Sequence, residues 1–244
     1  MTSNDSGVLF VVTGSHYTFA ATDAARSVAD TNPWLKIGIF SDQDIADPIF
    51  HFIGKIEGSD SRRKHEYVRQ SPFANTLYLD SDVRVVADLR DLFRLLERHE
   101  MAGAHVRYRS SPRRLGRHQL DIPQAFPQIN CGVLLYKKCL AVDDLFQSWA
   151  DLYRVGGFTR DQIPFREALW QSQVEFYAIA SEYNTRSIPL FPSKSPLPVI
   201  LHINALHSLS QLKRIWTHLL LMPLRARLRR FAKHGHKPVK PAPR

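Results

Sequence analysis

A chain of 244 residues with 44% hydrophobic residues is long enough for one large globular domain, or for one domain with an appendage. Two cysteines, Cys131 and Cys139, exclude a disulfide framework and a cysteine-based zinc site, and they favour a reducing compartment. The formal net charge of +10 lies at one end, because residues 211–244 hold ten Lys and Arg and no Asp or Glu, which leaves 23 basic and 23 acidic residues in 1–210. The charge of the chain therefore gives no reason to expect specific nucleic-acid binding by residues 1–210.

Residues 1–7 are polar, and no apolar run approaches the length of a membrane span. We therefore expect a cytoplasmic enzyme body. The chain then begins with a β-branched strand at 8–12, a loop of small residues at 13–15 and an Ala-rich helix at 17–29. A strand, a tight loop and a helix in this order present backbone N–H groups to a phosphate or nucleotide. The loop lacks the glycines of a dinucleotide fingerprint, the lysine of a P-loop and the Gly- and Arg-rich pattern of a sugar-nucleotide pyrophosphorylase.

The next strands and the helix after them bring further polar residues toward this loop. A strand at 35–40 is followed by Ser41 and Asp42, and Asp42 either bonds a base or ribose or caps the following turn. A third strand is expected at 49–56. A basic helical segment at 62–69 then ends before Pro72. Lys64 is the residue of this segment that we expect to meet a diphosphate, although a run of charges also fits a solvated face.

The central feature of the sequence is Asp80-Ser81-Asp82, which follows a short apolar strand at 77–79 and precedes a strand at 83–86. Open α/β sheets bind ligands at the carboxyl ends of their strands. Side chains at i and i+2 point the same way, so both carboxylates can face one Mg²⁺ or Mn²⁺ with Ser81 turned aside. We expect Asp82 to be the more exposed carboxylate and the essential ligand. The alternative is a solvated turn.

The following stretch predicts an amphipathic helix at 89–99 and a long loop at 107–127 that is rich in Arg and Pro. A loop of this length is usually functional, so it is a candidate acceptor loop or lid. A buried strand at 129–136 opens with Asn130 and Gly132, and glycine inside a strand marks a bulge or a close backbone approach.

Helices are expected at 140–153 and 163–170, and Asp161 and Gln162 directly precede the second of them. Asp161 either takes part in a site or caps that helix. Residues 187–199 are irregular, and a late strand at 200–204 carries His202. His202 is either a third metal ligand or a structural histidine.

Taken in order, these pieces resemble the GT-A-fold glycosyltransferases, and most closely family 8, the glycogenin and galactosyltransferase-like group, over about residues 7–207. The resemblance implies an α/β, Rossmann-like domain with a mixed central sheet in residues 1–210. It also implies a nucleoside-diphosphate sugar donor, usually with uridine, and transfer that retains the anomeric configuration.

The resemblance further implies a role for each matching residue. A Mn²⁺ or Mg²⁺ cofactor would be held by Asp80, Asp82 and His202. The nucleoside and donor would be bound by Thr13, Gly14, Tyr17, Asp42, Lys64 and Ser81, and the donor sugar would be surrounded by Asn130, Asp161 and Gln162. The chain departs from the family at its second diphosphate contact, a His, Gly and Lys set after the late histidine. Asn204-Ala-Leu-His207-Ser stands in that place here, and His207 or Lys213 would replace the contact.

The mechanism expected from these residues follows from charge. A dication bridging both phosphates stabilises the negative charge of the leaving nucleoside diphosphate. A carboxylate or amide beside the sugar, from Asp161 or Gln162, would stabilise an oxocarbenium-like sugar. The acceptor is expected to be a glycan or a lipid-linked sugar.

Residues 211–244 form a basic tail in which apolar residues recur at helical spacing among Lys and Arg. This pattern predicts either an amphipathic helix lying on an anionic membrane or a helix that packs its apolar stripe on the domain. Ten positive charges favour the membrane, which would make the protein peripheral on the cytoplasmic membrane face. A different class of function, a non-catalytic module that binds nucleotides or anionic surfaces through this tail, also fits the composition.

We predict that the full chain co-sediments with anionic liposomes at low salt and that high salt weakens this binding. Each basic residue near an anionic bilayer adds about 1 kcal/mol of attraction, and salt screens it. Residues 1–210 are the matched control and should stay in the supernatant. Equal binding by residues 1–210, or no binding by the full chain, would exclude attachment through the tail.

Overall fold

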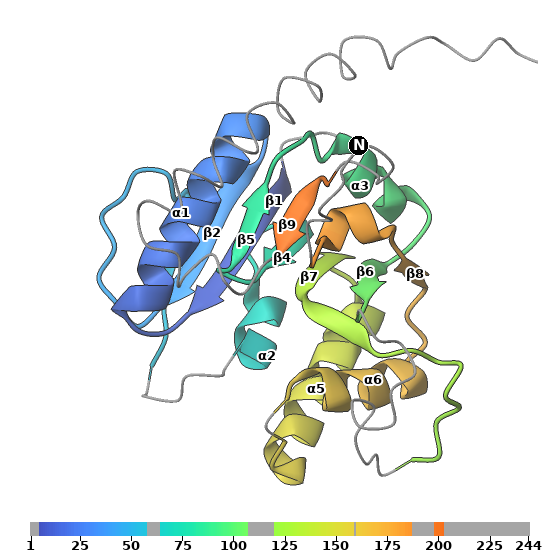
Figure 1. The fold of residues 1–244 in the computed structure, drawn as a ribbon. Coiled ribbons are helices and arrows are strands. Elements are labelled where there is room, and N and C mark those ends of the chain that lie inside the picture. The colour runs from blue at the N-terminus through green and yellow to red at the C-terminus, as the bar shows by residue number, and fades with distance from the viewer. Residues whose placement is uncertain (1–4, 58–63, 107–119, 159, 187–197, 203–244) are drawn as a thin grey trace, which may run out of the picture.

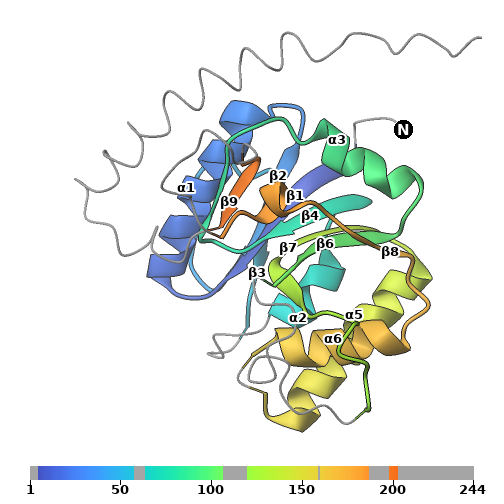
Figure 2. The same cartoon turned by 45° about the vertical axis from the view of Figure 1, so that its right-hand side comes forward.

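The structure is a computed structural model that describes residues 5–57, 64–106, 120–158, 160–186 and 198–202, and it shows the expected mixed α/β fold (Figures 1 and 2). Within these residues a seven-stranded sheet has the strand order β3-β2-β1-β4-β7-β6-β8, and β5 pairs with β9 in a second sheet. The proposed boundary at residue 210, the acceptor-loop residues 107–119, Asn204, His207, Lys213 and the tail lie outside the described residues.

The strands and helices have the following bounds. The strands are β1 (Ser6–Val12), β2 (Lys36–Ser41), β3 (Phe52–Lys55), β4 (Asn75–Leu79), β5 (Val83–Val85), β6 (Met101–His105), β7 (Ile129–Lys137), β8 (Phe176–Ala178) and β9 (Ile200–His202). The α-helices are α1 (Ser15–Thr31), α2 (Lys64–Tyr67), α3 (Arg90–Phe93), α5 (Leu140–Gly156) and α6 (Gln162–Gln171). Three short 3₁₀ helices are η2 (Val68–Gln70), η3 (Arg94–Glu97) and η4 (Ser181–Asn184).

The strand order creates a candidate ligand-binding edge at the centre of the large sheet. Strands β3, β2, β1 and β4 are parallel, and the chain turns from β1 to β2 on one side and places β4 on the other. Such a switch point leaves a crevice outside the carboxyl ends of the two central strands. Strand β7 runs antiparallel to β4, so its first residues lie at the same edge as the last residues of β4.

The sheet separates two apolar layers, and the alternation of side chains along β4 shows how. Leu77 and Leu79 belong to a core with residues of α1, β5 and β9, whereas Tyr78 belongs to a second core with residues of α5 and α6. This period of two is what a strand buried on both faces requires. The site residues at the end of β4 are therefore held by a strand that is packed from both sides.

Some elements differ from the sequence-based expectations. The helix expected at 89–99 is a short α3 followed by the 3₁₀ turn η3. Over only two turns, the spacing of apolar residues is compatible with an α-helix and with a 3₁₀ helix, so it did not distinguish them. The strand expected at 49–56 begins only at Phe52, because the N–H of Phe50 bonds the carbonyl of Asp47 in a turn. Strands β6 and β8 were not predicted, and β6 forms because β7 and β8 pair with its two edges.

The described end of the candidate acceptor loop, residues 120–127, is irregular as predicted, and one buried arginine fixes it. Arg166 on α6 is 1% exposed. Its guanidinium donates to the carbonyls of Phe126 at 2.8 Å and Pro123 at 2.8 Å. A third, longer bond of 3.4 Å reaches Ile122. The helix that follows Asp161 is thus tied to the loop.

No helix in the described ranges is both long enough and apolar enough to cross a bilayer.

We predict that Arg166→Met lowers the free energy of unfolding by about 3 kcal/mol, because methionine fills the space and leaves the carbonyl groups without their donor. Urea unfolding followed by circular dichroism measures the change. Arg94→Ala is the control, since Arg94 forms an exposed pair with Asp91 and its loss should cost about 0.5 kcal/mol or less. Equal losses in both variants would show that Arg166 does not anchor the loop.

Candidate metal centre and donor site

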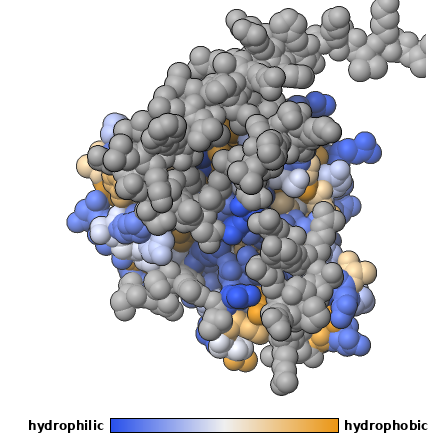
Figure 3. Space-filling view, in the orientation of Figure 1, coloured by the Kyte–Doolittle hydropathy of each residue, from blue (hydrophilic) through white to orange (hydrophobic). Residues whose placement is uncertain are grey.

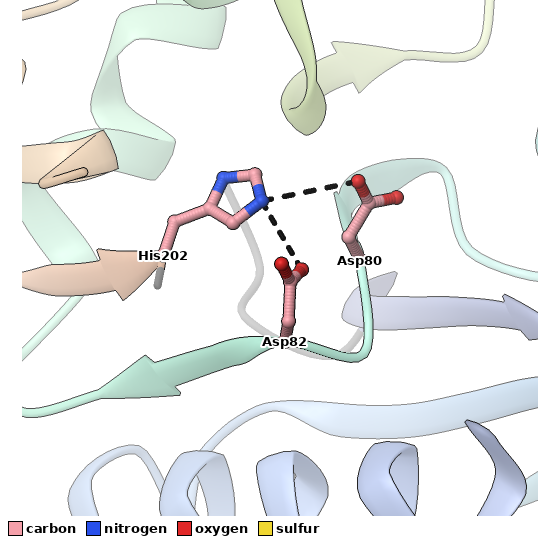
Figure 4. A group of neighbouring side chains, drawn as sticks. All are labelled: Asp80, Asp82 and His202. Atoms are coloured by element: carbon pink, nitrogen blue, oxygen red, sulfur yellow. Dashed lines mark ion pairs between the residues drawn. The ribbon is translucent and has the colours of Figure 1, made fainter. Parts of the chain in front are cut away.

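Three potential metal ligands meet at the carboxyl edge of the sheet (Figure 4). Asp80 directly follows β4, Asp82 directly precedes β5, and His202 ends β9. The pairing of β5 with β9 sets Val83 opposite His202, which brings the histidine beside Asp82. One ligand atom from each of the three side chains lies within 4.8 Å of the others.

Asp80, Asp82 and His202 form a compact, partly buried cluster. His202 Nε2 lies 3.1 Å from Asp82 Oδ1 and 3.9 Å from Asp80 Oδ2. The side chain of Asp82 is 16% exposed and that of Asp80 is 30% exposed. The expectation that Asp82 is the more exposed carboxylate is therefore wrong, because the pairing of β5 with β9 lays His202 against Asp82.

Gly132 makes the close approach possible, as its place in the strand predicted. The pairing of β4 with β7 puts Gly132 opposite Asp80, whose N–H bonds the Gly132 carbonyl at 2.9 Å. A β-carbon at position 132 would overlap both His202 and the Asp80 carboxylate. The missing side chain thus leaves room for the ligands.

The contacts of His202 define its tautomer. Its Nε2 lies 2.9 Å from Arg186 Nη1, and its Nδ1 lies 2.8 Å from Asn184 Oδ1. A guanidinium can only donate, so we assign the lone pair to Nε2 and the proton to Nδ1, which donates it to Asn184. The Nε2 lone pair then faces the same space as the two carboxylates.

The residues present fit a divalent cation. Two carboxylates and the lone pair of a neutral imidazole converge on one space, and a divalent cation among them would offset their mutual repulsion. A set of two oxygen ligands and one nitrogen ligand suits Mn²⁺ well and Mg²⁺ less well. The solvated-turn alternative for Asp80 and Asp82 does not describe this packed arrangement.

Lys64 lies on the other side of Asp80. Its ion pairs and partial burial exclude the alternative that it belongs to a solvated face. Its ammonium lies 2.5 Å from Asp161 Oδ2 and 3.1 Å from Asp80 Oδ1, and its side chain is 18% exposed. Burial alone would lower the pKa of Lys64, but Asp161 and Asp80 together raise it well above its usual value. Lys64 is therefore a cation that joins α2 to the edge of the sheet.

Asp161 pairs with Lys64 and makes no side-chain capping bond to α6, so the capping alternative is not what the structure shows. Burial alone would raise the pKa of Asp161, but the ammonium of Lys64 lowers it below the usual value. Trp149 Nε1 donates to the backbone carbonyl of Asp161 at 2.9 Å and so fixes the start of α6. Gln162, the first residue of α6, lies half-buried beside it.

The Asp80 carboxylate is oriented by the different contacts of its two oxygens. Its Oδ1 accepts from the Tyr78 hydroxyl at 2.6 Å and from Lys64, while its Oδ2 is the atom nearer to His202. Tyr78 lies in β4 and Asp80, two residues later, directly follows it, so the extended backbone turns both side chains the same way. That spacing was a signal for Tyr78 that the sequence reasoning missed. It also missed Asn184 and Arg186, for which no local pattern points to a site.

Two of the remaining predicted residues lie in the same region with local contacts. The Asn130 side-chain oxygen accepts from the Gly132 N–H at 3.1 Å, and Asn130 is 5% exposed. Ser81 is half-buried in the turn between β4 and β5. Figure 3 shows hydrophilic residues gathered in the middle of this face of the molecule.

The predicted nucleoside residues lie at the ends of β1 and β2. Asp42 Oδ1 accepts from the Gly14 N–H at 2.8 Å and from Gln43 Nε2 at 3.0 Å. Burial alone would raise the pKa of Asp42, but the hydrogen bonds from Gly14 and Gln43 help to lower it below its usual value. Gly14 has a φ of +83°, which a residue without a side chain adopts readily. Beside Gly14, Thr13 is half-buried and Tyr17 is 51% exposed.

We predict that Asp161→Asn lowers the free energy of unfolding at pH 7 by about 3 kcal/mol, because it leaves the Lys64 ammonium with Asp80 as its remaining carboxylate partner. Since the pKa of Asp161 is lowered on folding, its stabilisation is present above the unfolded value of about 3.9 and is lost as pH falls through the folded value. Urea unfolding at pH 7 and pH 3.5 should therefore show a smaller difference at the lower pH.

The control for this prediction is Asp91→Asn, which removes an exposed carboxylate. It should change stability by no more than about 0.5 kcal/mol at either pH. A loss in Asp161→Asn that is the same at both pH values would contradict an ionised Asp161 paired with Lys64.

No protein-family model matches the chain, and a search of curated protein sequences also gives no match. Solved structures do match. Glycosyltransferase GlyE of Streptococcus pneumoniae TIGR4 has a TM-score of 0.59 at 22% identity and covers 97% of this chain and 65% of its own. Galactosyltransferase LgtC, solved with donor and acceptor sugar analogues, has a TM-score of 0.58 at 14% identity and covers 81% of this chain and 87% of its own.

Mouse xyloside xylosyltransferase 1 has a TM-score of 0.54 at 13% identity and covers 84% of this chain and 100% of its own. The chain thus spans slightly less than two thirds of the length of GlyE. At these identities the likeness concerns the fold. The chain has the GT-A fold of these glycosyltransferases.

Proposed function

We propose that the protein is a metal-dependent glycosyltransferase that moves a hexose from a nucleoside-diphosphate donor, with uridine as the nucleoside, to a glycan or lipid-linked acceptor. The observation that carries the proposal is the cluster of Asp80, Asp82 and His202 at the switch point of the sheet. The glycosyltransferases that share the fold support it, and LgtC was solved with donor and acceptor sugar analogues.

Asp80, Asp82 and His202 would hold Mn²⁺ or Mg²⁺. When bound, this ion neutralises the negative charge that develops on the diphosphate as the sugar–phosphate bond breaks. Tyr78 and Lys64 orient Asp80 by bonding its Oδ1, and Asn184 orients His202 by bonding its Nδ1. Such outer contacts fix the direction in which ligand atoms point.

Asp161 and Gln162 are the residues that we assign to the donor sugar, with Asn130 on the neighbouring strand. Lys64 keeps the Asp161 carboxylate ionised, so a negative charge is available beside the positive charge that develops on the sugar. The same ammonium neutralises part of the negative charge of Asp80 and Asp161, which lets an anionic donor approach. Retention of anomeric configuration is part of this proposal.

The nucleoside would lie at the ends of β1 and β2. Asp42 bonds the backbone N–H of Gly14, whose φ is positive, so the loop after β1 is formed before a ligand binds. Tyr17, on the first turn of α1, exposes half of its surface and offers a ring on which a base can stack. Ser81 lies in the turn where the donor phosphates would meet the cation.

The membrane role of residues 211–244 is a separate part of the proposal. Its support is the ten basic residues of the tail and their apolar neighbours at helical spacing. A tail that lies on an anionic membrane would bring the active site to a lipid-linked acceptor on the cytoplasmic face.

We predict that Asp82→Asn and His202→Ala each lower Mn²⁺-dependent release of UDP from UDP-sugars, tested over a panel of donors, by about tenfold or more. Each change removes one ligand of the cation, and weakened ligation costs about 10–100-fold in metal affinity or activity. His202→Ala should also raise the Mn²⁺ concentration that gives half-maximal rate.

Asp91→Asn, which removes an exposed carboxylate on α3, is the matched control and should keep full activity. Circular dichroism confirms that each variant is folded. Undiminished, metal-dependent UDP release by Asp82→Asn would contradict the proposed site. The absence of UDP release from every donor with the unchanged chain would contradict the proposed reaction.

A further inference from the structure

Arg186 lies beside His202 because the backbone holds it there. Thr185 forms a parallel bridge with Leu201, its N–H bonds the Ile200 carbonyl at 2.9 Å, and its own carbonyl accepts the N–H of His202 at 2.9 Å. The next residue is Arg186, whose Nη1 lies 2.9 Å from His202 Nε2. The guanidinium is therefore placed against the imidazole by the pairing of its own chain segment with β9.

The atom that Arg186 contacts is also the atom that a metal ion needs. Nδ1 of His202 is used by Asn184, so Nε2 is the nitrogen left to bind a cation. Nε2 has one lone pair, and it can accept a guanidinium N–H or bind a metal ion, but not both. Arg186 and a divalent ion therefore compete for His202.

We propose that Arg186 holds the cation position of this site in the metal-free protein and transfers to the diphosphate of the nucleotide when a divalent ion binds Nε2. The proposal rests on the proposed function, since it requires that a nucleoside diphosphate binds at Asp80, Asp82 and His202. It adds a residue that governs both metal and nucleotide binding, and nothing in the sequence pattern pointed to it.

The direction of the transfer follows from charge and reach. The hydrogen bonds of Thr185 to β9 keep the backbone of Arg186 beside the site after its side chain leaves Nε2. A diphosphate held by an ion at His202 Nε2 would lie near the guanidinium, because Arg186 Nη1 is 2.9 Å from that nitrogen. A guanidinium matches phosphate with two parallel hydrogen bonds, and such bonds to charged groups are stronger than neutral ones.

Lys64 is less suited than Arg186 to move onto the diphosphate. Its ammonium is taken by Asp161 and Asp80, which fix it by ion pairs of 2.5 and 3.1 Å. Moving it toward a phosphate would leave Asp161, a carboxylate with a quarter of its side chain exposed, without this cation. For Arg186 the incoming ion takes the place of the guanidinium at His202 Nε2.

This exchange couples the two ligands. Metal alone must displace a guanidinium and therefore binds weakly, whereas metal with nucleotide binds more tightly because the guanidinium gains a phosphate. The coupling is reciprocal, so the metal must strengthen nucleotide binding by the same factor. Removing the Arg186 side chain should then strengthen one binding step and weaken the other, which loss of structure alone does not do.

The test uses the full chain and its Arg186→Ala variant. Binding of Mn²⁺ alone is measured from the electron paramagnetic resonance signal of free Mn²⁺, and binding of UDP at saturating Mn²⁺ is measured by calorimetry. We expect Arg186→Ala to bind Mn²⁺ alone several-fold more tightly and UDP with Mn²⁺ about tenfold or more weakly, the loss expected for a hydrogen bond to a charged group. Arg186→Lys keeps the positive charge without the planar guanidinium. Its affinities for Mn²⁺ and UDP should therefore fall between those of the unchanged chain and of Arg186→Ala.

Arg94→Ala is the matched control, an exposed arginine on η3 that should change neither affinity. Unchanged or weaker binding of Mn²⁺ alone by Arg186→Ala would overturn the competition. Unchanged binding of UDP would overturn the transfer to the diphosphate. If the unchanged chain binds UDP with Mn²⁺ and the variant does so equally, this inference fails alone, whereas no UDP binding by the unchanged chain would overturn the proposed function as well.

Discussion

The candidate site depends on the space that Gly132 leaves empty. Asp80 and His202 are far apart in the sequence, and their side chains meet where a β-carbon at position 132 would lie. The register of β7 on β4 sets Gly132 opposite Asp80, and the register of β9 on β5 sets His202 beside Asp82. A one-residue slip in either pairing would turn the side chains to the other face and separate the ligands. Precise strand pairing is therefore a condition of the chemistry.

Charge balance gives the site a second level of organisation. Asp80, Asp82 and Asp161 bring three carboxylates together, and Lys64 and Arg186 bring two basic groups, so these five side chains carry one negative charge in excess. A divalent ion would reverse this sign and prepare the edge of the sheet for an anionic diphosphate. Metal and nucleotide are thus electrostatically suited to bind together.

The sequence predicted the parts of the site whose signals are local. An apolar strand followed by Asp80 and Asp82 has a period and a composition that can be read directly, and so has the strand that carries His202. The sequence did not predict β6, whose Met-Ala-Gly-Ala-His stretch lacks β-branched residues and is held in place by its two neighbours. Asp161 shows the same limit, because capping and ion pairing share one local sequence and only the position of Lys64 decides between them.

Asn184 and Arg186 show what tertiary contacts add to a predicted ligand. They lie on a segment that no periodicity marked, yet they bond the two nitrogens of His202 and together define where its proton lies. Because a guanidinium and a metal ion both require a lone pair at Nε2, an exchange of one for the other leaves the proton on Nδ1 and the bond to Asn184 intact. The imidazole can therefore pass from one cation to the other without rotating or changing its charge, so the site is organised for a cation before any metal binds.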